Sequence, residues 1–214
     1  EFRRVLFRSA LREVLPQISE AYRIAFQGDP DIPPFSMRVM RDGTEAEIAG
    51  GLKYGVADDF RKILNASRQI RVVHLDSVGG RLGEGRKLFD LFQERGLNTY
   101  VSSRCLSACT LAFAGGRERY LLNGAVLGFH RGAFAGVREE AFDNEQASVF
   151  RKAGFSASFI QAAVATPNKD MWRPTVAELL TAGVVTKVVK GDEFAISGVG
   201  TDFTYEKASD AVLN

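Results

Sequence analysis

The sequence predicts an α/β domain with a mostly parallel sheet. Three short apolar runs, at 70–77, 98–103 and 124–130, alternate with stretches in which apolar residues recur at helical spacing. Glycines close most of these segments, as is usual where strands and helices alternate in βαβ units. With 214 residues, of which 45% are hydrophobic, the chain is long enough for one such domain with modest extensions.

The individual elements follow from local patterns. The predicted strands are short apolar or β-branched runs, at 37–40, 46–49, 70–77, 98–103, 124–130 and 184–190. The predicted helices have apolar residues at helical spacing, in the segments 51–67, 81–95, 107–116 and 138–164, the last comprising one or two helices. The Asp-Gly of RDGT predicts a hairpin turn between the first two strands. Thr175 and Glu178 match a capping box at the start of one more helix.

Both ends of the chain are expected to lie outside this core, which is predicted over 37–190. Residues 1–36 form an N-terminal arm, in which an amphipathic stretch precedes the turn-rich GDPDIPPF. Residues 1–9 resemble a cloning scar, and no initiator Met precedes them, so we expect a natural N-terminus with any signal or membrane anchor to be missing. Residues 191–214 are expected to form a peripheral C-terminal tail.

Composition excludes several kinds of partner. Lys and Arg number 28 against 26 Asp and Glu, and basic residues do not cluster with aromatic ones, so we expect no nucleic-acid partner. No run reaches the roughly 18 to 20 apolar residues that span a bilayer. The two cysteines, Cys105 and Cys109, have no histidine or second cysteine pair nearby, so no metal or other cofactor is expected. They could form a disulfide in an oxidising compartment or simply pack a helix start.

Two strand-to-helix junctions carry the candidate chemistry, because backbone N–H groups there point outward unpaired. The first leaves its strand through Gly79 and Gly80, where no Cβ prevents the amides from turning toward a ligand. At the second, Ser107 opens a helix whose free amides and dipole would stabilise an oxyanion. Together they form part of a site for acyl transfer.

A serine nucleophile needs a base, and the chain has two histidines. His74 lies inside a strand, where alternation would bury it or point it away. His130 ends a strand and precedes polar residues, which makes it the better base. The alternative is that Ser107 is an N-cap and His130 a strand-end histidine whose hydrogen bonds are satisfied.

The succession LDSVGG, CLSACTLAFAGGRERYL and AVLGFH resembles the Clp protease proteolytic subunit. That family has a glycine pair after a strand, a serine opening a buried helix and a histidine ending the next strand. The likeness covers about 46–190, and the serine within CxSACT is most similar to a divergent, periplasmic or membrane-associated branch. The resemblance implies a ClpP/crotonase-like fold, a β-β-α superhelix with a mostly parallel sheet.

The resemblance also implies roles for single residues. These are nucleophile for Ser107, base for His130, and oxyanion-hole donors for the amides of Gly79, Gly80 and Ala108. A third residue must orient the imidazole. Asp170 is assigned to this place because its interval to the following TAGVV segment is comparable with that of the family's acid. Asp143 is nearer to His130 in sequence, but its acidic surroundings are typical of a solvated helix face.

The function implied is a serine endopeptidase that cleaves peptide or protein substrates through an acyl-enzyme on Ser107. We expect a homo-oligomer and a periplasmic or membrane-associated location, with the cytoplasm as the alternative. Two other classes stay open. One is a non-catalytic Clp-like scaffold module, and the other is a crotonase-like acyl-CoA-binding enzyme, whose fold shares the oxyanion architecture.

Overall fold

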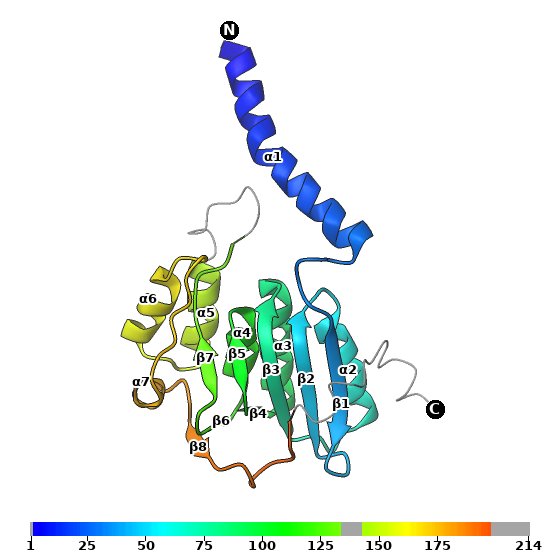
Figure 1. Cartoon of the computed structure of the whole chain (residues 1–214), viewed down its shortest axis with the longest axis vertical. Coiled ribbons are helices and arrows are strands. Elements are labelled where there is room, and N and C mark those ends of the chain that lie inside the picture. Colours follow the sequence, from blue (N-terminus) through cyan, green and yellow to red (C-terminus); the bar gives the residue numbers. More distant parts are fainter. Residues whose placement is uncertain (1, 134–142, 198–214) are drawn as a thin grey trace.

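The structure is a computed structural model that describes residues 2–133 and 143–197 (Figure 1). Its strands are β1 (Phe35–Met40), β2 (Glu45–Leu52), β3 (Val72–Gly80), β4 (Asn98–Val101), β5 (Arg104–Leu106), β6 (Arg119–Leu122), β7 (Val126–Gly128) and β8 (Lys187–Val189). Its helices are α1 (Phe2–Gln27), α2 (Val56–Ala66), α3 (Leu82–Arg95), α4 (Ala108–Ala114), α5 (Asp143–Lys152), α6 (Ala157–Ala165) and α7 (Val176–Thr181).

The strands form one sheet in the described part of the chain. Its main path runs β1-β2-β3-β4-β6-β8, and β5 and β7 extend from β3 as a branch. The hairpin of β1 with β2 is antiparallel, and the other strand pairings are parallel. The predicted α/β class with a mostly parallel sheet is therefore confirmed.

Most predicted elements are present, and two strands were missed. The hairpin at RDGT and the capping box of Thr175 and Glu178 are both formed. Gly96 ends α3 in the left-handed conformation that glycine favours. The missed strands, β5 and β6, are three and four residues long. Strands of similar length, such as β7 and β8, were predicted because they lie within longer apolar runs, whereas β5 and β6 adjoin the buried helix segment and charged residues that hide so short a strand.

The core positions the start of α4. Helices α2 and α3 lie behind the sheet in Figure 1, and Phe60 of α2 meets Phe92 of α3 edge to face inside the core. Helix α3 approaches α4 closely at Gly85, where a Cβ would lie 2.3 Å from the carbonyl oxygen of Ala108. Glycine at this point therefore lets α3 support the first turn of α4.

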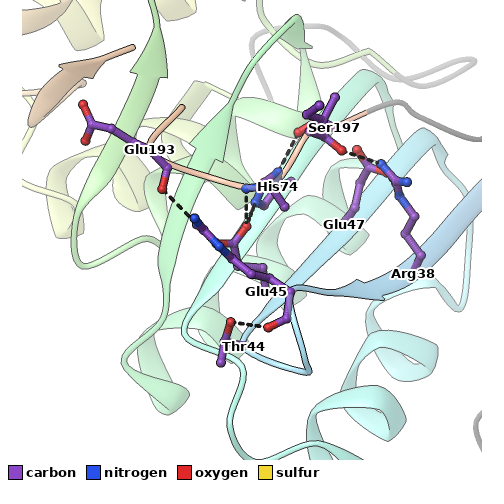
Figure 2. Close-up of polar contacts among 10 residues, drawn as sticks. Arg38, Thr44, Glu45, Glu47, His74, Glu193 and Ser197 are labelled. Carbon is purple, nitrogen blue, oxygen red and sulfur yellow. Dashed lines mark hydrogen bonds and ion pairs between the residues drawn. The ribbon is translucent and has the colours of Figure 1, made fainter. Parts of the chain in front are cut away.

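A short segment of the predicted C-terminal tail packs against the sheet. Phe194 lies on the rings of Tyr100 and Tyr120, with centroid distances of 4.6 and 5.0 Å. Figure 2 shows how polar groups on β2 and β3 meet the same segment, with His74 between Glu45 and Ser197. The beginning of the tail is thus part of the fold rather than peripheral, and 198–214 lie outside the described residues.

The predicted arm contains a long helix. Helix α1 projects away from the sheet (Figure 1), and Pro16 lies within it. The turn-rich residues that follow α1 bring the chain back to β1. Among the helices of the described segments, none combines the length and hydropathy needed to cross a bilayer.

Candidate active site

Ser107 lies between β5 and α4 in a backbone conformation that side chains rarely adopt, with φ 53° and ψ −127°. Such a conformation costs about 1 to 3 kcal/mol and persists only where surrounding structure holds it. The Ser107 N–H donates to the carbonyl oxygen of Gly128 at 2.9 Å, and its own carbonyl accepts from the N–H and hydroxyl of Thr110. Strand β7 and the first turn of α4 therefore fix the direction of the Ser107 side chain.

The base predicted from sequence lies beside this serine. His130 Nε2 is 2.6 Å from Ser107 Oγ, and His130 Nδ1 is 2.7 Å from the carbonyl oxygen of Asn168. Because a carbonyl can only accept a hydrogen bond, this network assigns the proton of neutral His130 to Nδ1. Nε2 is then free to accept from the Ser107 hydroxyl, which is the orientation a general base needs.

Packing around Phe129 explains why His130 faces the serine. Phe129 is buried among aromatic rings, including Phe159 of α6, and its N–H and carbonyl both bond the backbone of Trp172. The next residue, His130, points elsewhere because alternation continues beyond β7. Gln146 of α5 then brackets this stretch, donating to the His130 carbonyl at 3.1 Å and accepting from the Gly132 N–H at 2.7 Å.

Asp170 does not occupy the place that was predicted for it. Nδ1 of His130 bonds the Asn168 carbonyl, and the side chain of Asp170 is exposed. A turn from Pro167 to Asp170, closed by an N–H to carbonyl bond of 3.0 Å, presents a backbone oxygen to the imidazole. The interval in sequence located this turn, but it could not tell which group of the turn meets the ring. Asp143, the alternative, lies 3.5 Å from Arg131.

We therefore expect Asp170→Ala to change the reactivity of Ser107 toward a fluorophosphonate by no more than about twofold, as for surface substitutions generally. The matched variant is Asn168→Ala, which removes the side-chain bond from Asn168 Nδ2 to the Arg131 carbonyl and loosens the turn. It should slow labelling about tenfold, because small misplacements of a catalytic group are costly. A tenfold loss of labelling rate in Asp170→Ala would instead indicate that the Asp170 carboxylate acts on His130.

The glycine turn contacts Ser107 directly. A Cβ on Gly79, whose φ is +94°, would lie 2.7 Å from Ser107 Cβ and 2.6 Å from the Leu106 carbonyl oxygen. Its N–H already donates to Ser77 Oγ at 3.1 Å. Gly79 therefore serves close packing, and its predicted role as an oxyanion donor would compete with Ser77.

The other two predicted donors are better placed. Gly80, with φ +149°, lines the cavity beside Ser107, and a Cβ there would meet the Leu52 backbone at 2.5 Å. Ala108 is the first residue of α4, so its N–H lies beyond the reach of intrahelical acceptors. The amides of Gly80 and Ala108 are thus the candidates for an oxyanion hole.

A cavity of about 220 Å³ opens at Ser107. Its lining includes Tyr54, Arg81, Leu82, Glu145 and Asn168. Arg81 bonds the carboxylates of Asp29 and Glu20, and chiefly the bond to Asp29 raises the pKa of its guanidinium. Glu145 pairs with Arg86 at 3.0 Å. Both charged lining residues are therefore engaged in ion pairs, and those of Arg81 tie the N-terminal arm to the edge of the cavity.

Cys105 and Cys109 form a disulfide, with their Cα atoms 5.3 Å apart. Of the two alternatives that the sequence left open, the structure has the bonded pair, and both residues are buried at the head of α4. The described residues include no cluster of three or more His, Cys, Asp or Glu side chains suited to a metal ion.

Comparison with known proteins identifies the fold. No protein-family profile and no curated protein matches the chain. Among solved structures, ClpP1 from Listeria monocytogenes superposes with a TM-score of 0.58 at 16% identity, over 70% of this chain and 92% of that one. A point mutant of the same protein gives 0.56 at 17% identity, over 71% and 94%. A mutant of the membrane-bound stomatin-specific protease 1510-N gives 0.54 at 18%, over 67% and 77%. The chain therefore has the ClpP-type protease fold, in a divergent form.

Proposed function

We propose that the chain is a serine peptidase in which Ser107 attacks a peptide carbonyl and His130 accepts the serine proton. The observation that carries this proposal is the 2.6 Å contact between Ser107 Oγ and His130 Nε2. It occurs at the start of a helix, beside a cavity, on a backbone held in an unfavourable conformation. Strain of this kind is concentrated at functional sites.

The reaction follows the usual course of acyl transfer. Ser107 Oγ forms a bond to the peptide carbon while its proton moves to His130 Nε2, and the amides of Gly80 and Ala108 bind the resulting oxyanion. His130 then gives the proton to the leaving amine. Water attacks the acyl-enzyme with His130 again accepting a proton, which returns to Ser107 as the acid product leaves.

The hydrogen-bond partner of His130 Nδ1 determines how fast a peptidase we expect. The Asn168 carbonyl holds the imidazole in the correct tautomer and orientation. A neutral carbonyl stabilises the imidazolium that forms during attack less than a carboxylate does, because hydrogen bonds to charged groups are stronger. We therefore expect a slower peptidase than one with a Ser-His-Asp triad. This same feature favours the second candidate function, a non-catalytic scaffold with the ClpP-type fold.

A fluorophosphonate probe distinguishes the two functions. The folded protein is treated with the probe, digested with trypsin and analysed by mass spectrometry. We expect one adduct, on Ser107 within the peptide 105–117, together with cleavage of an unfolded substrate protein that the probe suppresses. The absence of an adduct on Ser107, or labelling at other serines alone, would support the scaffold and contradict the peptidase.

We also propose a periplasmic or otherwise exported location. The disulfide of Cys105 and Cys109 supports it, since such bonds form and persist mainly in oxidising compartments. Cells are quenched with acid, free thiols are alkylated under denaturing conditions so that buried ones react, and mass analysis of the 105–117 peptide then checks the location. Alkylated cysteines at both positions would place the protein in a reducing compartment.

A further inference from the structure

The disulfide encloses the candidate nucleophile. Cys105 lies in β5 and Cys109 in α4, and Ser107 is the middle residue of the five that the bond closes into a ring. Ser107 is also the residue of this ring with the positive φ. The cross-link therefore spans the strained turn at which the strand ends and the helix begins.

We propose that Cys105 and Cys109 are positioning residues for Ser107, and that their bond keeps the serine hydroxyl directed at His130. Without the bond, rotation at Ser107 could move the two Cα atoms apart, to a limit of about 13 Å if all five residues became extended. A disulfide tolerates at most about 6.8 Å. The bond thus opposes any relaxation at Ser107 that separates the strand from the helix by more than this.

The disulfide adds a covalent restraint to the contacts that already hold Ser107. Gly79 lies so close to Ser107 and Leu106 that the turn is packed from the side of β3. The hydrogen bonds of Ser107 to Gly128 and Thr110 hold its N–H and its carbonyl separately. The disulfide is the covalent connection between the strand and the helix across the turn itself.

Loop length and burial argue against two other roles. In the chain-entropy account, stabilisation by a disulfide rises with the length of the loop it closes, so a five-residue ring lies at the low end of what such bonds contribute to global stability. Both cysteines are 0% exposed. A reductant reaches a sulfur only after local opening, which makes a permanent brace a better fit than a redox switch.

The test compares the wild-type protein with the double variant Cys105→Ala and Cys109→Ala. The intact mass of the wild type first establishes whether the thiols are joined, and free thiols in the protein purified under oxidising conditions overturn the proposal. The rate of Ser107 labelling is then measured at several probe concentrations, which separates the affinity for the probe from the rate of reaction at saturating probe. We expect the rate to fall about tenfold with binding nearly unchanged, as for misorientation of a reacting group.

A second readout does not depend on activity. The chain has only two histidines, so the ring signals of His130 can be assigned by NMR with the help of a His74 variant. In the double variant, the His130 signals should move toward those of Ser107→Ala, in which the hydrogen bond to Oγ is absent. Leu64→Ala, a cavity variant in α2, serves as a control of lowered stability and should leave these signals at their wild-type positions.

The outcomes distinguish the positioning role of the disulfide from the peptidase function. The positioning role rests on the proposed function only where it predicts a change in the rate of labelling. If the wild type is not labelled but the His130 signals move, the peptidase proposal fails and the positioning role holds. If the rate and the His130 signals of the double variant both match the wild type, the positioning role is overturned. Should the double variant not fold, the wild type refolded with reductant, its thiols free, takes its place.

Discussion

Gly79→Ala is expected to slow the labelling of Ser107 by a fluorophosphonate at least about 100-fold, close to the background given by Ser107→Ala. The new Cβ would lie 2.7 Å from Ser107 Cβ and 2.6 Å from the Leu106 carbonyl oxygen, so β3 or the Ser107 turn must move. The alanine would also have to adopt φ +94°, which is unfavourable for any residue with a Cβ. Labelling kinetics measure the loss, and circular dichroism shows whether the fold persists.

The matched control for this prediction is Gly83→Ala. Gly83 lines the same cavity and lies in α3, but a Cβ there would meet no atom within 4 Å. Alanine is favoured over glycine inside a helix by roughly 0.5 to 1 kcal/mol, so this variant should keep the labelling rate and gain slightly in thermal stability. Equal labelling rates in the Gly79 and Gly83 variants would show that the close approach of β3 does not hold Ser107.

The order of chemical groups along the chain was predictable, because each group sits at a recognisable boundary. Ser107 precedes a buried helix, His130 ends an apolar run, and the glycine pair closes a strand. Each boundary shows in local sequence as a change of periodicity or as a glycine. The 2.6 Å contact of Ser107 with His130 then follows from the parallel pairing of β5 with β7, which brings the ends of both strands to one edge.

The supporting groups were not predictable in the same way. The partner of His130 Nδ1 is a backbone carbonyl, that of Asn168, and every residue has one. Gln146 lies in the polar sequence DNEQ, and nothing in that sequence distinguishes it from its solvated neighbours. Such contacts depend on how the loops are arranged in space. The periodicity of apolar residues in the sequence carries no information about that arrangement. The interval between Asp170 and the TAGVV segment was the signal that led to the correct turn, although not to the correct group within it.

The largest effect on stability is expected for Glu45→Ala, in the buried polar cluster of Figure 2. The carboxylate of Glu45 accepts from His74 Nε2 at 2.8 Å, from Arg41 Nη1 at 2.8 Å and from the Ala195 N–H at 2.9 Å. The variant leaves the buried His74 Nε2–H and the Ala195 N–H without an acceptor, which at about 1 to 3 kcal/mol for each group gives a loss of about 3 kcal/mol. For a chain of this size, thermal unfolding should show a decrease of about 6 to 12 °C in Tm.

The same cluster predicts how stability depends on pH. Burial lowers the pKa of His74 below 6.5, against the opposing effect of Glu45. Burial alone would raise the pKa of Glu45, but hydrogen bonds from Arg41, Ala195 and His74 together lower it below 4.5. In both cases the unfolded chain takes up its proton at a higher pH than the folded one does. Stability contributed by His74 is therefore lost as pH falls below 6.5, and that contributed by Glu45 as pH falls below 4.5.

An exposed ion pair provides the control for the predicted loss of stability in Glu45→Ala and for its predicted pH dependence. Glu94→Gln removes the exposed partner of Arg61 and should change the free energy of unfolding by no more than about 0.5 kcal/mol. In Glu45→Ala the decline below pH 4.5 should be smaller than in the wild type, because one carboxylate with a lowered pKa is gone. If the wild type instead became more stable between pH 6.5 and 5, His74 would be charged in the folded state. Its bond to Glu45 would then be an ion pair strong enough to outweigh burial, and His74 Nδ1 would donate to Ser197 Oγ, since both ring nitrogens carry a proton in the charged form.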